Sequence, residues 1–343
     1  MGLAELANNG RPEQRFTLGL LALDGAMLSS LAGPADLMRV AQQLALLRDP
    51  GTPLRLNVSL ISARGDACLT CSGGLRLEGF SCGGADPDVL LVPGYMHSGT
   101  RDLLQRLAAL GPEVELLRAM HSRGVRLASA CSGAFLLAEA GLLDGRNATT
   151  SWWLDAPFRQ RYPKAQLQIE QLVVEDGPLT TSGASSAVLS YVLRLIGRIA
   201  GEELAQQTAR VLLIDPDRQS QAPYITQALR EKPRHSLSER IDHYLQQSLH
   251  ADVSVAALAE HVGTSERSLL RHFRAEFGAT PLEYIQRLRV ERAKALLETT
   301  HLSFDEIVER CGYSDSASFR KLFKRATTLT PTDYRERFRL RPH

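Results

Sequence analysis

The chain has no apolar run long enough to cross a membrane as a helix. Its two most apolar stretches, VLLVPGYM at residues 89–96 and YVLRLIGRIAG at residues 191–201, are interrupted or too short. The first fifteen residues also lack the cationic stretch and apolar core of a secretory signal. We therefore expect a cytoplasmic protein with no membrane partner.

Cysteine is scarce and charge is nearly balanced. Five cysteines at irregular positions in 343 residues argue against a disulfide scaffold. Cys68 and Cys71 form a C-x₂-C pair with Cys82 nearby, but a zinc site needs four ligands and no fourth lies at a typical spacing. We expect no metal site and no cofactor. The net charge of +2 indicates no partner, so any nucleic-acid signal must come from local charge.

The sequence is long enough for two domains. It is 44% hydrophobic and 23% charged, which is typical of a soluble globular chain with real cores. After a tail of residues 1–15, apolar segments of strand length alternate with helical segments up to residue 201. Buried strands separated by helices predict a parallel sheet covered on both faces. The expected strands are residues 16–23, 55–62, 88–94 and 125–131; the expected helices are residues 34–47, 101–110, 112–124, 132–143 and 184–199; a hairpin at residues 169–182 turns at Asp176 and Gly177.

The composition changes after residue 201. GEELAQQTARVLLI can be helical, but DPDRQSQAP and REKPRH are polar and broken by proline. This composition predicts a connector over residues 202–235. Residues 236–343 form the predicted C-terminal domain, which is helical throughout residues 237–339, and Lys and Arg outnumber Asp and Glu after residue 302. The expected helix starts carry Ser254, Thr264, Pro281 and Ser316.

Residues 253–278 and 302–329 repeat one pattern. Each segment has a short amphipathic helix, a turn glycine (Gly263 or Gly312), a polar cap, and a helix that mixes aromatic and basic residues. This pattern predicts a helix-turn-helix motif, used twice in an all-α domain and joined by a helix at residues 281–299. A chain with two such motifs is predicted to bind double-stranded DNA.

The second helix of each motif has one apolar and one polar face. Leu269, Phe273 and Phe277 fall at i, i+4 and i+8 and predict a buried stripe, as do Phe319 and Phe323 in the second motif. Exposed arginine can hold guanine with two bonds, Ser and Ala suit thymine methyls, and Lys324, Arg325 and Arg289 suit phosphates. The bland alternative for each arginine is a solvated helix face. The predicted DNA contacts are Arg267, Arg271, Arg274, Ser316, Ala317, Arg320, Lys321, Lys324 and Arg325.

Residues 236–340 resemble the AraC/XylS class of bacterial transcription regulators. The residues that carry the resemblance are Ala257, Leu258, Ala259, Gly263, Ser265, Leu269, Phe273, Gly278, Pro281, Tyr284, Arg287, Ala293, Leu296, Leu297, Ile307, Gly312, Tyr313, Phe319, Phe323, Lys324, Pro331 and Tyr334. The resemblance implies that the two helices enter successive major grooves on one face of the DNA, about 34 Å apart. One departure is Val308-Glu309, where such domains usually have Ala.

The N-terminal half contains one sharp local feature, VRLASACSGAFLLAEAGLLDG. An apolar strand ends at Cys131, and a helix begins at once through Ser132 and Gly133. Small neighbours allow a strained strand-to-helix turn that projects one side chain, as in a nucleophile elbow. The helix N-terminus is expected to favour the thiolate. The alternative is a small buried thiol in a crowded turn.

Residues 16–200 resemble the PfpI/ThiJ-like branch of the class I glutamine amidotransferase-like fold, which is an α/β flavodoxin-like sandwich. The elbow, DVLLVPG, LAGPADLMRVAQ and TTSGASSA carry this resemblance. Joined to an AraC-type domain, the architecture is similar to that of GlxA-type transcriptional regulators. The resemblance implies a ligand-sensing and dimerisation domain at residues 16–201, a homodimer, and an effector that is a small nitrogenous metabolite such as an amino acid or a quaternary amine.

The resemblance also shows which catalytic groups are replaced. Ser30 stands where catalytic members have a carboxylate, Ser151 follows Thr149-Thr150 where a His is common, and Tyr95 replaces the second glycine of the oxyanion loop. Without a positioned proton-transfer partner, Cys131 is not expected to be catalytic, so the chain is not expected to be an enzyme. The alternatives are a cysteine-dependent hydrolase or hydratase with a DNA-binding tail, and redox sensing by Cys131.

A ligand pocket is expected at the carboxyl ends of the parallel strands, where α/β folds bind ligands. Trp152 and Tyr95 are candidates to hold a cationic amine by cation–π contact, or simply to pack the domain or its dimer interface. The predicted lining is Ser30, Tyr95, His97, Cys131, Ser132, Ser151 and Trp152, with residues 182–185 beside them. The sequence thus predicts a ligand-responsive, DNA-binding transcriptional regulator.

Overall fold

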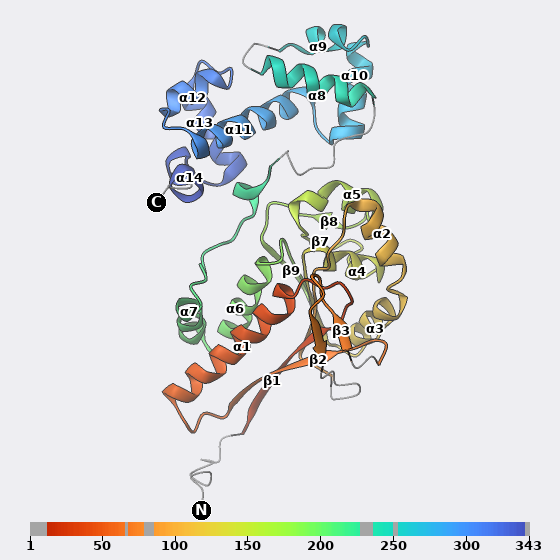
Figure 1. The fold of residues 1–343 in the computed structure, drawn as a ribbon, viewed down its shortest axis with the longest axis vertical. Helices are drawn as coiled ribbons and strands as arrows, with labels where there is room; N and C mark the ends of the chain where they lie inside the picture. Colours follow the sequence, from red (N-terminus) through yellow and green to blue (C-terminus); the bar gives the residue numbers. More distant parts are fainter. Residues whose placement is uncertain (1–11, 66–67, 79–85, 227–235, 250–252, 340–343) are drawn as a thin grey trace, which may run out of the picture. The chain divides into compact units, whose positions relative to one another are not determined.

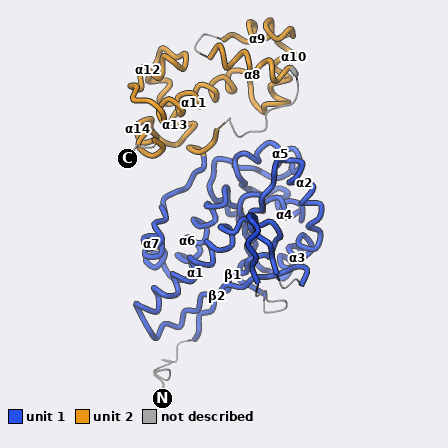
Figure 2. Tube along the Cα trace, in the orientation of Figure 1, with its two compact units in different colours: residues 1–221 blue, residues 222–343 orange. Residues whose placement is uncertain are grey.

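The computed structural model describes residues 12–65, 68–78, 86–226, 236–249 and 253–339. The chain divides into two compact units, residues 1–221 and residues 222–343 (Figure 2). Each unit has its own hydrophobic core, so each is described by itself.

Unit 1 is built on a six-stranded sheet in the order β2-β1-β5-β6-β10-β9 (Figure 1). All neighbouring pairs are parallel except β9 and β10, which form the predicted antiparallel hairpin. All four residues of β5 are buried, as a central parallel strand covered on both faces requires. The strands are β1 (Gln14–Leu21), β2 (Leu54–Ile61), β5 (Val89–Val92), β6 (Arg126–Ala130), β9 (Val173–Asp176) and β10 (Leu179–Ser182).

Helices cover both faces of this sheet, which confirms the predicted α/β sandwich. On one face lie α1 (Ser29–Arg48) and α6 (Ala187–Ala200), and on the other lie α3 (Gly111–Ser122) and α4 (Ala134–Glu139) (Figure 1). The remaining elements of unit 1 are α2 (Thr100–Ala108), α5 (Asp155–Arg161), α7 (Glu202–Val211), the small pairs β3 (Cys68–Thr70) with β4 (Arg76–Glu78) and β7 (Asn147–Ala148) with β8 (Gln166–Leu167), and the 3₁₀ turns Cys131–Gly133 and Trp152–Leu154.

Helix α1 begins five residues before the predicted start. The sequence-based prediction placed the helix start at Pro34, and proline is common at the first helical position. In the structure Pro34 lies inside α1, where it lacks the N–H of one helical bond. The turn before it still forms, because Leu31, Pro34 and Leu37 are buried together in the core of unit 1.

The end of unit 1 lies later than the composition suggested. Residues 202–221, expected to begin a connector, are part of this unit. Helix α7 buries Leu204, Ala205 and Ala209 against α1 and α6, and its Glu203 pairs with Arg48 at 2.7 Å. Because the outer face of α7 is polar, the composition of this segment gave no indication that its other face is buried.

Unit 2 is helical and has two small cores. The first gathers residues from α8 (Ser236–Ser248), α9 (Val255–His261) and α10 (Glu266–His272), and the second gathers residues from α12 (Phe304–Arg310), α13 (Ser316–Thr327) and α14 (Pro331–Phe338). Helix α11 (Pro281–Thr299) supplies Tyr284 and Ile285 to the first core and Val290, Ala293 and Leu297 to the second. One continuous helix thus joins the two predicted motifs.

The helix starts of unit 2 are set by side-chain caps. Ser254 and Ser265 accept hydrogen bonds from the backbone at Ala257 and Ser268, and Asp315 accepts one from Ala317. Capping boxes at Thr280, Ser303 and Thr330 begin α11, α12 and α14. Three predicted caps, Thr264, Pro281 and Ser316, each lie one residue from the observed caps Ser265, Thr280 and Asp315.

Val308, which departs from the AraC pattern, is 1% exposed in the second core. Its larger side chain is accommodated there. Within the described ranges, no helix is both long and apolar enough to span a membrane.

A deletion in the core of unit 1 tests the packing. Phe135 is fully buried, with its ring centroid 5.0 Å from that of Phe158, so Phe135→Ala is expected to lower the free energy of unfolding by about 3–5 kcal/mol. Leu47→Ala is the control: Leu47 is 80% exposed, and the change is expected to be within about 0.5 kcal/mol. Chemical denaturation measures both; equal losses would contradict the packing.

Candidate functional site

The second helix of the first motif, α10 with the turn that continues it, is called the first recognition helix below, and it carries three exposed arginines. Leu269 and Phe273 are fully buried and Phe277 is partly buried, which confirms the predicted apolar stripe. The helix continues from α10 into a π-helical turn, Phe273–Phe277, which ends at Gly278. Arg267, Arg271 and Arg274 are exposed on the other side. These side chains are therefore accessible to DNA.

The second recognition helix, α13, has the same organisation. Phe319 and Phe323 are fully buried. The exposed residues are Ala317, Arg320, Lys321, Lys324 and Arg325, and Ser316 is half-buried. The Arg320 guanidinium lies 4.6 Å from the ring centroid of Phe304, which restricts where it can point. Hydrogen bonds from Ser318 and from the backbone at Ala317 hold the pKa of the capping Asp315 carboxyl below its usual range.

Two residues of unit 2 differ from the sequence-based interpretation. Arg289 was a candidate phosphate contact, but it is buried, donates to the Leu249 carbonyl and stacks 5.0 Å from the ring centroid of Tyr313. That interpretation was wrong, because the aromatic partner is remote in sequence. Leu270 was not among the predicted DNA contacts. It is a large apolar residue, 42% exposed, and it neighbours Arg271 on the first recognition helix.

In unit 1 the predicted elbow forms at the end of β6. Cys131 has a φ of 53°, in the left-handed region that an L-residue rarely adopts. Close approach makes this turn possible. A Cβ at Gly94 would lie 2.9 Å from the Cβ of Cys131, and a Cβ at Gly133 would lie 2.7 Å from the Pro93 carbonyl oxygen. The loop after β5 and the elbow therefore fit together only with glycine at both positions.

Three hydroxyl groups form hydrogen bonds at the Cys131 elbow. Ser151 donates to Cys131 Sγ at 2.8 Å, and Thr150 donates to the Cys131 carbonyl, also at 2.8 Å. Ser132 accepts from the backbone N–H of Tyr95 at 2.9 Å and donates to its carbonyl at 3.0 Å. The sulfur itself is enclosed by side chains rather than by solvent.

Burial is the largest influence on the pKa of this thiol. It raises the pKa of Cys131 above the ordinary value, and hydrogen bonds from Ser151 and Ser132 offset only part of that increase. The expectation that the helix N-terminus would favour the thiolate was wrong, because desolvation outweighs the favourable contacts.

The other predicted effector residues differ in their burial and in their contacts. Ser30 is buried in the first turn of α1 and donates to the Met27 carbonyl at 2.7 Å and the Gly94 carbonyl at 3.4 Å. Trp152 is buried and packs edge-on against Trp153, with ring centroids 5.4 Å apart. His97 lies further along the loop after β5 and is half-buried.

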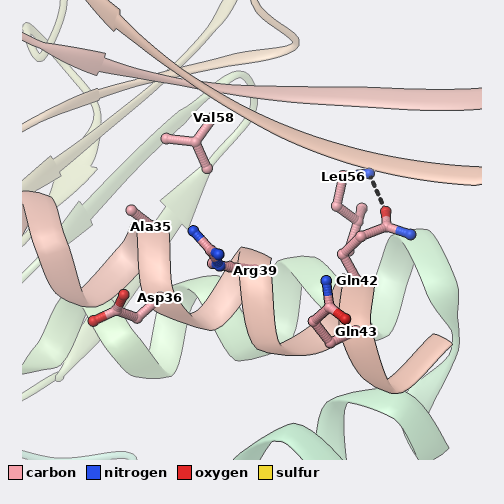
Figure 3. Close-up of a pocket in the computed structure, with 7 residues that line it drawn as sticks. All are labelled: Ala35, Asp36, Arg39, Gln42, Gln43, Leu56 and Val58. Atoms are coloured by element: carbon pink, nitrogen blue, oxygen red, sulfur yellow. Dashed lines mark hydrogen bonds between the residues drawn. The ribbon is translucent and has the colours of Figure 1, made fainter. Parts of the chain in front are cut away.

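Backbone bonds close this region. The loop after β1 pairs with the loop after β5 through Met27 N–H to Gly94 O at 2.8 Å and Met96 N–H to Gly25 O at 3.0 Å. Two cavities lie elsewhere in unit 1. One of about 440 Å³ lies between α1 and β2, where Gln42 accepts from the backbone of Leu56 at 2.7 Å (Figure 3). The other, of about 380 Å³, lies beside α6 and α7. None of the predicted effector residues lines either cavity.

The C-x₂-C pair lies at the β3–β4 hairpin. Arg76 donates to Cys68 Sγ at 3.1 Å, and Cys71 is buried with its pKa raised by desolvation and by Asp24. In the described part of the chain, no group of three or more His, Cys, Asp or Glu residues could hold a metal ion. Cys82 lies outside the described residues.

Both halves of the chain match known protein families. Residues 38–198 match the DJ-1/PfpI family, and residues 258–337 match a helix-turn-helix domain. The chain joins a DJ-1/PfpI domain to an AraC-type helix-turn-helix domain. It is a DNA-binding transcriptional regulator.

Its curated relatives carry the same description. The transcriptional regulator GbdR of Pseudomonas aeruginosa is 27% identical over 93% of this chain and 84% of its own length. The regulator CdhR of the same species is 31% identical over 65% of this chain and 66% of its own. GlxA of Rhizobium meliloti is 28% identical over 96% of this chain and 98% of its own. All three are named as regulators, in keeping with the expectation that the chain is not an enzyme.

Replacing one arginine in each recognition helix tests the DNA-binding surface. Arg271→Ala and Arg320→Ala are each expected to weaken specific operator binding by about 1–3 kcal/mol if the side chain contacts a base. Arg101→Ala removes an exposed arginine from α2 in unit 1 and is the control. A shift assay at fixed salt measures all three. Unchanged binding of both recognition-helix variants would rule out this placement.

Alkylation tests the state of Cys131. Because burial raises its pKa and encloses the sulfur, native Cys131 is expected to resist iodoacetamide from about pH 7 to pH 9. After denaturation it should react fully. Peptide mass spectrometry reads out each cysteine, and rapid modification in the native chain would contradict a closed site.

Proposed function

We propose that unit 1 senses a small nitrogenous metabolite, an amino acid or a quaternary amine, at the Cys131 elbow and thereby controls DNA binding by unit 2. The single observation that carries this proposal is Tyr95. Its hydroxyl is buried and has no hydrogen-bond partner among the described residues. A buried hydroxyl without a partner costs free energy, which a bound polar ligand would recover.

The position of the site supports the proposal. Tyr95 follows β5, Cys131 follows β6 and Gly183 follows β10, so all three lie at the carboxyl ends of parallel strands. Ligands of open α/β sheets bind at this edge. Because the site is closed in the structure, the effector must enter by separating the loops after β1 and β5.

The chemistry of the site suits a neutral or cationic group. The proposed contacts are the hydroxyls of Ser30, Ser132 and Ser151 with the rings of Tyr95 and Trp152, and His97 at the rim. Aromatic faces attract ammonium groups. The packing of Trp152 against Trp153 favours Tyr95 as the principal ring.

The alternative, a cysteine-dependent hydrolase or hydratase, needs a proton-transfer group at the sulfur. The described partners of the Cys131 thiol are the side chains of Ser151 and Ser132 and the Ser132 backbone. A hydroxyl that donates to a protonated thiol does not activate it. The proposed sensor therefore binds its effector without turnover. The proposal also includes a homodimer in the cytoplasm that contacts its operator through the predicted residues of α10 and α13.

Thermal shift of the full chain tests the effector proposal. Standard amino acids and choline-type quaternary amines are the probes, and a ligand at a hundred times its Kd adds about 2.7 kcal/mol to the stability of the folded chain. Tyr95→Phe should slightly stabilise the free chain, because it removes the unpaired hydroxyl, and should reduce the ligand-induced shift.

Tyr191→Phe is the matched control. Tyr191 is buried in α6, and its hydroxyl is paired with Thr180. This variant should lose stability but keep the full ligand-induced shift. If Tyr95→Phe kept the whole shift, the effector would not bind at Tyr95.

A further inference from the structure

Gln221 is the last residue of unit 1 and one of its most deeply buried polar residues, with 1% of its surface exposed. The residues before it run beside residues 170–172: Leu172 N–H donates to Gln219 O and Gln221 N–H donates to Glu170 O, both at 3.0 Å. The chain is therefore held by backbone bonds up to the residue at which unit 1 ends.

The Gln221 side chain is hydrogen-bonded to Thr150, which in turn bonds to Cys131 at the elbow. Its Nε2 donates to the Thr150 carbonyl at 2.8 Å and to the Ile169 carbonyl at 2.6 Å. Thr150 in turn donates through its hydroxyl to the Cys131 carbonyl at 2.8 Å. Two hydrogen bonds through one residue thus connect the strained backbone of Cys131 to Gln221.

A second path meets the same amide. Ser151, which donates to Cys131 Sγ, also lies 3.4 Å from the Gly183 carbonyl. A Cβ at Gly183 would lie 2.7 Å from Gln221 Oε1, so the amide packs directly on that glycine. Oε1 itself has no donor among the described residues. A buried network with one unpaired acceptor is incompletely satisfied, and the unpaired acceptor costs free energy.

The next residue belongs to unit 2. Ala222 begins a 3₁₀ turn, Ala222–Tyr224, that contacts α13. The ring of Tyr224 packs edge-on against Phe338 at 5.0 Å, and Lys294 donates to the Ile225 carbonyl. The turn is thus fixed to the half of unit 2 that carries the second recognition helix.

We propose that Gln221 is the positioning residue through which the state of the Cys131 elbow reaches the second helix-turn-helix motif. Gln221, which is hydrogen-bonded to the Thr150 carbonyl, is followed directly in the chain by the 3₁₀ turn that contacts α13. This inference rests on the proposed function, because it assigns the route by which an effector at the elbow acts on DNA binding.

A double-mutant cycle in the full chain tests the route without an effector. Thr150→Val removes the hydroxyl that bonds to the Cys131 carbonyl and keeps the shape of the side chain. The probe is a duplex selected by the wild-type protein from a randomised library, at fixed salt. Thr150→Val is expected to change its Kd about fivefold or more, the lower end of measured coupling between sites.

The same substitution is then made in a chain with one glycine inserted between Gln221 and Ala222. The insertion leaves both anchors in place, so the effect of Thr150→Val should disappear. A glycine inserted between Gly73 and Gly74, in an open turn of unit 1, is the control and should preserve it. No effect in the parent chain, or an equal effect with the insertion at residue 221, would overturn the proposal.

A second pair of variants guards against misfolding. Gln221→Met keeps the volume and removes the amide, while Gln219→Met changes an exposed glutamine two residues earlier. Deuterium exchange at residues 219–226 should respond to Thr150→Val in the Gln219→Met chain and not in the Gln221→Met chain. The opposite pattern would contradict the assigned role.

The two proposals fail in different ways. If the ligand-induced thermal shift survives the insertion but the Kd effect of Thr150→Val survives it too, the effector site stands and the route is wrong. If no ligand shifts the melting temperature while the cycle shows coupling, the route stands and the effector assignment is wrong.

Discussion

The left-handed backbone of Cys131 is the constraint around which unit 1 is arranged. A non-glycine residue in this region is strained by about 1–3 kcal/mol and persists only when its surroundings hold it. Gly94 and Gly133 permit the close approach of the neighbouring backbone. The hydroxyls of Thr150 and Ser151 bond to the carbonyl and the sulfur of Cys131. The same packing leaves Cys131 only 3% exposed, and this burial raises the pKa of its thiol.

Unit 2 depends on a simpler constraint. Neither three-helix group is large enough for an extensive core, and each buries only a small set of residues. Helix α11 contributes to both cores at once, so the two motifs share one structural support. One continuous helix therefore connects the two motifs through both cores.

Much of this could be predicted from local patterns. The alternation of apolar strands and helices indicated the parallel sheet, and the spacing of Leu269 and Phe273 indicated which side of the first recognition helix is buried. The start of α1 was predicted too late, because proline statistics say nothing of the burial of Leu31 and Pro34. Arg289 was misjudged for the same reason: its partner Tyr313 is far away in sequence.

The sequence by itself determined the two-part architecture and the DNA-binding class, because helical and strand periodicities and paired motifs are local properties. Only the tertiary structure decided that the Cys131 site is closed, that α7 belongs to unit 1, and that Gln221 lies beneath the elbow. Gln221 lies about seventy residues after Thr150 in the chain, in a segment whose composition is that of a connector. Its role depends on burial and on hydrogen bonds between distant residues, which no local pattern encodes.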